Sequence, residues 1–168
     1  ALGKRKVAYL PGLSDRLRLQ VADQVLAKAR AQAAGGDLRR AFLEEYWRAS
    51  FQQSIFVHEG RHALDRTLVT GLARLDDANL EYRAKLSELA LADYPTLALY
   101  NINAQTIGGD TPHGKANAKV LQGYVAWIEG HSTEVTGYDK ATPALMQVDK
   151  LTEDQIRHVA KTLDPIAL

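Results

Sequence analysis

Residues 37–69 read DLRRAFLEEYWRASFQQSIFVHEGRHALDRTLV. The stretch contains no proline, and Gly60 is its only glycine. Apolar and aromatic residues recur along its whole length, and Asp37 is placed to cap its first turn. These features predict either one long helix or two helices joined near residues 50–54.

The rest of the chain also favours helices, because apolar residues recur at helical spacing and no stretch alternates with a period of two. One short strand is allowed over residues 3–12. The fold class is therefore expected to be mainly α. The other expected elements are a helix over 15–33 capped by Ser14, a helix over 77–93 capped by Asp76 and Asp77, an apolar segment over 95–107, a helix over 112–129, a loop over 130–143, and a last helix to about 163 opened by the capping box of Thr152 and Gln155.

Composition narrows the class of protein. The 168 residues suit one domain over 1–168, either a mature chain or the catalytic part of a longer one. A net charge of +1 offers no basic excess to attract nucleic acid. No apolar run approaches the roughly 20 residues of a membrane-spanning helix. Without cysteine, any metal site must use histidine and carboxylate ligands, and cytoplasmic or exported locations both fit. The sequence gives no oligomeric state.

The segment His58-Glu59-Gly60-Arg61-His62 has the pattern H-E-x-x-H and is a candidate metal-binding motif. Four residues of an α-helix advance about 400°, so the two histidines share one face and lie about 6 Å apart along the axis. Two imidazoles placed in this way converge on one metal ion. Glu59 lies about 100° further round, where it reaches metal-bound water without being a ligand.

A catalytic zinc ion takes three protein ligands and keeps one position open to water. The next histidine along the chain is His113, so the third ligand is expected to be a carboxylate. The candidates that follow His62 are Asp65, Asp76, Asp77, Glu81 and Glu88.

The pattern over residues 50–90 resembles the gluzincin group of zinc metallopeptidases. In that group the third ligand is a glutamate on the helix after the H-E-x-x-H helix, and Glu81 follows His62 by nineteen residues, as in the aminopeptidase N branch. The resemblance implies a compact zincin-like helical domain, one Zn²⁺ per chain held by His58, His62 and Glu81, and Glu59 as general base. It also implies a peptide or protein substrate. The chain lacks the G-x-M-E-N motif of that branch, so no substrate preference is carried over.

Gluzincins add a downstream histidine or tyrosine that stabilises the developing oxyanion. We expect His113 in this role, and the other candidates are Tyr124, His131 and Tyr138. Asp65 has two open interpretations, as a hydrogen-bond acceptor for an imidazole or as a solvated or arginine-paired carboxylate. Glu88 lies seven residues after Glu81 on the same helix face, where it either orients a ligand or pairs with Lys85 or Arg83; the pairing is favoured. The loops 107–113 and 130–143 are the expected places for substrate recognition.

Two other hypotheses remain open. A ferritin-like two-metal bundle needs two Glu-x-x-His pairs, and Glu59 with His62 supplies only one, because neither Glu129 with His131 nor Gln155 with His158 fits. A zincin-like binding module without activity is the other hypothesis. An intact Glu59 weighs against it, since a structural metal site has no use for that carboxylate.

Overall fold

The computed structural model describes residues 11–68 and 75–164. Within these ranges the chain is mainly helical and contains no strand, so the expected fold class is confirmed. The elements are α1 Pro11–Ala33, α2 Leu38–Phe51, the π-helix η2 Gln52–Glu59, α3 Gly60–Leu68, α4 Asp77–Leu91, α5 Pro95–Ala104, α6 Pro112–Gly130, the 3₁₀-helix η3 Ala144–Lys150, and α7 Glu153–Leu163.

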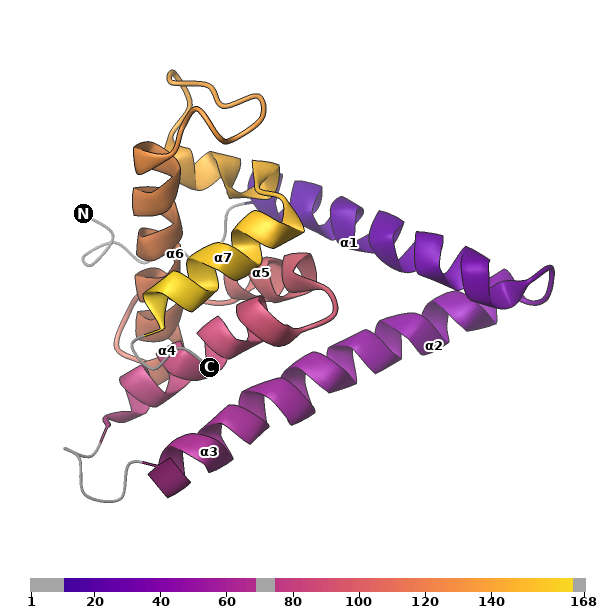
Figure 1. Cartoon of the computed structure of the whole chain (residues 1–168), viewed down its shortest axis with the longest axis horizontal. Coiled ribbons are helices and arrows are strands. Elements are labelled where there is room, and N and C mark those ends of the chain that lie inside the picture. The colour runs from indigo at the N-terminus through magenta and orange to yellow at the C-terminus, as the bar shows by residue number, and fades with distance from the viewer. Residues whose placement is uncertain (1–10, 69–74, 165–168) are drawn as a thin grey trace.

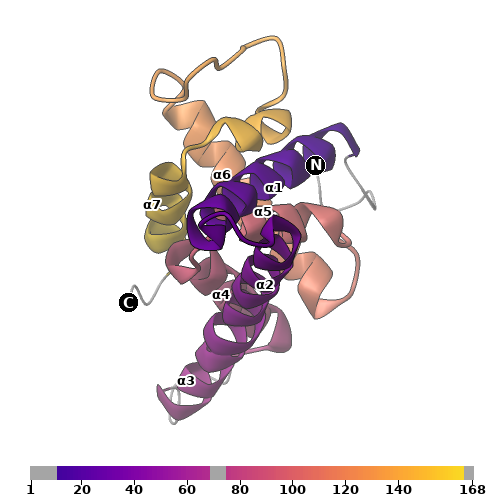
Figure 2. The same cartoon turned by 90° about the vertical axis from the view of Figure 1, so that its right-hand side faces the viewer.

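The elements α2, η2 and α3 follow one another without a break and form a single rod, as Figure 1 shows. Asp37 caps the start of this rod by accepting a hydrogen bond from the backbone N–H of Arg40 at 3.0 Å. The rod is therefore the single long helix that the sequence allowed, with its central turns widened to the π form. Figure 2 views the molecule from the α1–α2 turn and shows the rod running from there to α3.

The core lies around α4, against which α6 and α7 pack on one side and η2 and α3 on another. Its largest fully buried side chains include Leu86, Leu89, Leu121 and Tyr124. A smaller cluster of Val21, Val25, Ala49 and Leu97 joins α1 to α2 and α5. This second cluster fixes the hairpin of α1 and α2 to the body, and so fixes the direction in which the rod crosses α4.

Two of the residues predicted to cap helices do not do so. Asp76 caps α4 by accepting from the N–H of Asn79, whereas Asp77 is simply the first helical residue. Ser14 is not a cap, because α1 already begins at Pro11, whose fixed φ suits a first helical position. The strand expected over 3–12 falls mostly outside the described residues, and Gly12 is helical. The short helix η3 was not expected.

The capping box of Thr152 and Gln155 is present and opens α7. The loop expected over 130–143 is confirmed as a series of turns. Among the described residues, no helix has the length and apolar character needed to cross a bilayer.

Candidate metal centre

The predicted ligands come together where the rod crosses α4. His58 lies near the end of η2, His62 one turn later in α3, and Glu81 in the first half of α4. One donor atom from each of the three side chains lies within 4.8 Å of the other two. His62 is buried, and His58 and Glu81 are half-buried. The described part of the chain thus contains one His-His-Glu group of the kind that the sequence predicts.

The distances within this group suit a single ion. The Nε2 atoms of His58 and His62 are 3.1 Å apart. Nε2 of His58 lies 3.4 Å from Oε2 of Glu81, and Nε2 of His62 lies 3.4 Å from Oε1 of Glu81. Ligands about 2.0–2.1 Å from a tetrahedral zinc ion are about 3.3–3.4 Å apart along the edges. The three side chains therefore lie near the spacing of zinc ligands, with each imidazole facing a different oxygen of Glu81.

Glu88 fixes the orientation of His58. Its Oε1 lies 2.5 Å from Nδ1 of His58. An ionised carboxylate only accepts hydrogen bonds, so Nδ1 carries the proton and the lone pair of a neutral ring is left on Nε2, facing Glu81. A carboxylate behind a ligating imidazole is the usual arrangement at metal sites. The expected pairing of Glu88 with Lys85 or Arg83 is therefore wrong, because seven residues of α-helix place Glu88 on the same face as Glu81.

Burial opposes protonation of His58, but the hydrogen bond that its ring donates to Glu88 and the negative charges of Glu88 and Glu81 outweigh it. As a result, the pKa of His58 is raised above its ordinary value. Lys85, a buried lysine one turn beyond Glu81, acts in the opposite direction. The surroundings of His58 are therefore negative on balance, which also favours a bound cation.

Glu81 has an unusual set of neighbours for a half-buried carboxylate. Its ion-pair contacts among the described residues are all with imidazoles, from His58, His62 and His113. Its Oε2 is buried and has no hydrogen bond of good geometry, although Nδ1 of His113 lies 2.9 Å away. No lysine or arginine in the described ranges lies within ion-pair distance of it. A metal ion between these side chains would balance the charge of Glu81.

His113 stands beside the centre, with Nδ1 2.9 Å from Oε2 of Glu81 and a side chain that is 59% exposed. The loop before α6 holds it there. Thr111 caps α6, and Gly108 and Gly109 have φ of 82° and 79°, a conformation that other residues rarely adopt. A Cβ on Gly114 would lie 2.1 Å from the carbonyl oxygen of Gly108, so only glycine lets this loop close.

The other oxyanion candidates are engaged elsewhere. Tyr124 is buried in the core and donates to the carbonyl of Ile156 at 2.6 Å. The ring of His131 stacks on Trp127, and Tyr138 packs against the main core cluster. Of the four residues considered, His113 is the one that the structure places at Glu81.

Glu59 ends η2 and is exposed. Within the described part of the chain it makes no hydrogen bond and no ion pair. It follows His58 directly and is not one of the three side chains that converge. Glu59 is therefore outside the group of three and is not engaged by another described side chain.

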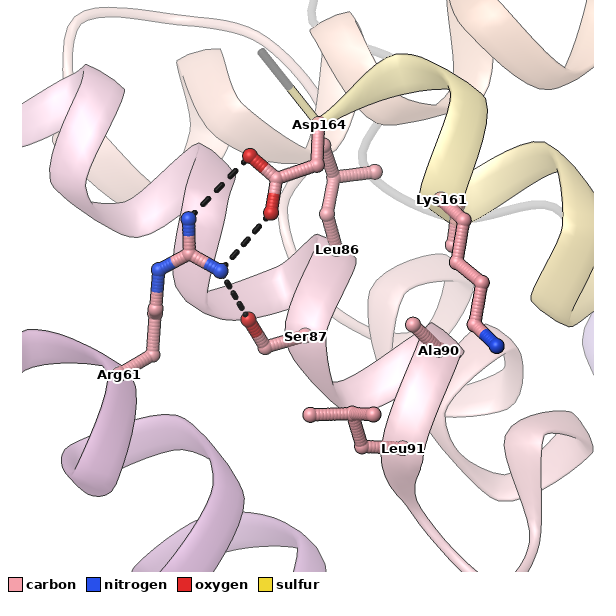
Figure 3. A pocket seen from close by; sticks show the side chains of 8 residues that line it. Arg61, Leu86, Ser87, Ala90, Leu91, Lys161 and Asp164 are labelled. Atoms are coloured by element: carbon pink, nitrogen blue, oxygen red, sulfur yellow. Dashed lines mark hydrogen bonds and ion pairs between the residues drawn. The ribbon is translucent and has the colours of Figure 1, made fainter. Parts of the chain in front are cut away.

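The ion-pair contacts of Asp65 among the described residues are with two arginines, and both are made by its Oδ1 atom. Nε of Arg61 donates to it at 2.9 Å, and the guanidinium of Arg83 lies 2.9 Å away. Arg61 also donates to Asp164 at 2.8 Å and to Ser87 at 2.9 Å, as Figure 3 shows. Of the two interpretations of Asp65, the arginine partner is the one observed. This network ties α3 to α4 and to the end of α7, and so fixes the helix that carries His62.

An apolar cleft of about 390 Å³ lies along the motif helix, lined mainly by Phe56, Val57, Gly60, Leu64 and Leu91. A Cβ added at Gly60 would meet nothing within 4 Å. No neighbouring backbone therefore requires a glycine at this position. The missing side chain leaves this part of the cleft wall open. This places a recess for apolar groups next to the residues of the H-E-x-x-H pattern.

Comparison with known proteins gives no match for this chain. No family model matches it, no curated protein does so significantly, and neither does any solved structure. The support for a function comes from the centre itself.

Proposed function

We propose that this chain is a zinc-dependent hydrolase, most specifically a metallopeptidase that cleaves peptide bonds with activated water. One observation carries the proposal. Two Nε2 atoms and the carboxylate of Glu81 lie near the spacing of zinc ligands, and among the described residues no lysine or arginine pairs with that carboxylate. A structural ion pair would use Lys or Arg at this position, as the Asp65 network does.

Zinc suits this donor set better than other metals do. Two imidazoles and one carboxylate form the ligand set of several catalytic zinc sites, whereas magnesium and calcium prefer oxygen ligands alone. In such sites the ring nitrogen of the histidine that does not bind the metal usually donates a hydrogen bond to an acceptor, and Glu88 is that acceptor for His58. We therefore propose one Zn²⁺ per chain.

The roles of the side chains follow from their places. When bound, zinc lowers the pKa of a bound water toward about 7 and polarises a carbonyl oxygen. His58, His62 and Glu81 hold the ion. Glu59, exposed beside them, accepts the proton of the attacking water and passes it to the leaving amine. His113, at the solvent edge of Glu81, is placed to donate a hydrogen bond to the carbonyl oxygen as negative charge develops there.

A peptide substrate is supported by two observations. The pattern of ligands resembles that of the gluzincin peptidases, and the helix that carries the H-E-x-x-H pattern also lines an apolar cleft, at Val57, Gly60 and Leu64, that could take an apolar side chain of a peptide. The described surface gives no basic patch at the centre that would favour a phosphate ester instead, since the neighbours of Glu81 are imidazoles.

The decisive experiment measures metal content and hydrolysis together. The parent chain is loaded with zinc, dialysed, analysed by mass spectrometry for bound metals, and assayed with a library of quenched fluorescent peptides. We expect one zinc per chain and cleavage that a chelator abolishes. In Glu59→Gln we expect zinc to be retained and cleavage to fall by at least about 100-fold, the order of a general base's contribution.

Glu44→Gln is the matched control, because Glu44 is an exposed glutamate on the same rod and pairs only with Arg40. It should keep both zinc and full cleavage. Zinc binding without cleavage of any peptide by the parent would instead indicate a binding module. Two metal ions per chain would indicate a ferritin-like bundle, and full activity in Glu59→Gln would contradict the proposed mechanism.

A further inference from the structure

The first half of the H-E-x-x-H pattern lies in a π-helix. The eight residues of η2 run from Gln52 to Glu59, whereas His62 follows in the α-helix α3. π-Helical turns are rare and are often found at functional sites, because they are less favourable than the α form and need a compensating interaction. The interaction that compensates here involves a buried glutamine, Gln53.

Gln53 and His58 bind the two oxygens of the same carboxylate. Nδ1 of His58 donates to Oε1 of Glu88, and Nε2 of Gln53 donates to Oε2 of Glu88. Because a carboxylate only accepts, the amide nitrogen of Gln53 must be the contacting atom. Glu88 is thus fixed at both oxygens, once by the histidine that it orients and once by the glutamine.

The π-helix makes this double contact geometrically feasible. Gln53 and His58 are five residues apart, and in an α-helix such residues lie about 140° apart, on nearly opposite sides. A π-helix closes its turns between residues i and i+5, so the two side chains lie one above the other. Only the wider turn brings both donors to the same side of the rod, facing α4.

The contact does not serve stability alone. Oε1 of Gln53 is buried and makes no hydrogen bond with the described residues. An amide that leaves its own oxygen without a partner is unfavourable in a buried position. The contribution of Gln53 is therefore its one bond to Glu88, and through Glu88 its effect on the ring of His58.

We propose that Gln53 is a positioning residue of the metal centre, and that the π-helical turn exists to hold Gln53, Glu88 and His58 in line behind the ion. This inference rests on the proposed function, since it assigns the turn to metal binding. Gln53 holds the carboxylate, the carboxylate holds the Nδ1–H tautomer of His58, and that tautomer leaves the Nε2 lone pair aimed at the ligand position beside Glu81. Gln53 itself touches neither metal nor substrate.

The test compares zinc affinity in Gln53→Met and Gln52→Met, measured by competition with a chromophoric chelator. Methionine keeps the length of glutamine but donates no hydrogen bond. Gln52 lies in the same π-helix and contacts only the N–H of Asp93, at 3.3 Å, among the described residues. We expect zinc affinity to fall about 10-fold in Gln53→Met, as for other partners of metal-bound histidines, and to be unchanged in Gln52→Met. Equal affinities in the parent and Gln53→Met would overturn the inference.

A double-mutant cycle tests whether Gln53 affects zinc affinity through Glu88 or through a general loss of structure. If Gln53 acts only through Glu88, then Gln53→Met should have no further effect on zinc affinity in a Glu88→Gln background. Independent effects that multiply would contradict this. Gln53→Asn, which keeps the amide but is too short to reach Glu88, should match Gln53→Met and replaces it if the methionine variant does not fold by circular dichroism.

A spectroscopic readout distinguishes failure of this inference from failure of the proposed function. The Nδ1–H proton of His58, assigned by its loss in His58→Asn, should give a slowly exchanging NMR signal in the parent with or without zinc. We expect exchange to quicken in Gln53→Met and not in Gln52→Met. A parent that binds no zinc would end the proposed function, while this proton would still show whether Gln53 holds Glu88; unchanged exchange in Gln53→Met would end the inference alone.

Discussion

Glu45 and Glu81 are both glutamates held between helices, yet their surroundings differ in kind. Glu45 accepts two hydrogen bonds from Arg48, at 2.6 and 3.0 Å, one from Tyr94 at 2.6 Å and one from Gln32 at 3.2 Å. The bond to Arg48 is the largest of the effects that lower the pKa of Glu45 to about 2. Among the described residues Glu81 forms ion-pair contacts with imidazoles alone, and its buried Oε2 has no hydrogen bond of good geometry.

The difference teaches how to tell a structural carboxylate from a ligand. A structural carboxylate is paired with a permanent cation and closes its hydrogen bonds within the protein. A metal-binding carboxylate is surrounded by histidines, which are neutral when they ligate and leave the negative charge for the ion. By this criterion Glu45 fastens the α1–α2 hairpin to α5, and the surroundings of Glu81 fit the metal-binding role proposed for it.

The largest expected effect is on metal binding. In the parent, zinc at 100 times its Kd should raise the free energy of unfolding by about 2.7 kcal/mol, which corresponds to about 5–10 °C in Tm for a chain of this size. Glu81→Gln should abolish this shift, because zinc loses its one charged ligand. Thermal unfolding with zinc and with EDTA measures it. An unchanged shift would remove Glu81 from the ligand set.

Glu45→Gln should give the opposite pattern. We expect a loss of about 2 kcal/mol in the free energy of unfolding, because Tyr94 and Arg48 lose an ionised acceptor. The loss should stay below the roughly 3–5 kcal/mol of a fully buried pair, since the Arg48 side chain is 45% exposed and regains water. Urea unfolding measures the loss, and the zinc-induced shift in Tm should be the same as in the parent.

Acid should remove the contribution of Glu45 in a defined window. Its pKa in the folded chain is about 2, below the ordinary value of 4.5. Ionised Glu45 therefore stabilises the fold fully above pH 4.5, and this stabilisation is lost as the pH falls toward 2. In urea unfolding with EDTA, the difference between the parent and Glu45→Gln should shrink over that range. A difference that stays constant from pH 5 to 2 would contradict the assignment.

The smallest expected effect is a difference in stability between the loss of the Tyr94 hydroxyl and the loss of the Tyr82 hydroxyl. Tyr94→Phe should cost about 1 kcal/mol, because its hydroxyl donates to an ionised carboxylate. Tyr82→Phe is the control, since its hydroxyl reaches the carbonyl of Leu163 only at 3.4 Å. We expect Tyr82→Phe to unfold at nearly the same urea concentration as the parent. Equal losses in both variants would indicate that the bond to Glu45 has no special strength.

The sequence predicts what depends on local spacing. The caps at Asp37 and Asp76 and the box at Thr152 involve residues within three positions of one another, so propensity alone is sufficient to find them. His58 and His62 are brought together by one helical turn. Glu81 is brought to them by tertiary packing, and it is the resemblance to the gluzincins, through its nineteen-residue interval from His62, that distinguishes it from the other four acidic candidates.

What the sequence missed depends on contacts between distant elements. The sequence favours pairing of Glu88 with nearby basic residues, although its position seven residues after Glu81, on the same helix face, also indicates a role at the same site. The π-helix could not be predicted from its own residues. Gln53 stabilises it through a hydrogen bond to Glu88, which lies on another helix, and that contact exists only in the folded chain. The arginine network around Asp65 likewise joins residues far apart in the chain, which spacing along one helix does not reveal.

The bond between Arg61 and Asp164 has a consequence for the order of events during synthesis. The two residues are separated by 103 positions, so the clamp on α3 closes only after α7 has been made. Contacts of such long range form late, because the chain between them must first be ordered. We expect a nascent chain to bind zinc weakly until its last helix docks, so that capture of the metal marks the completion of folding.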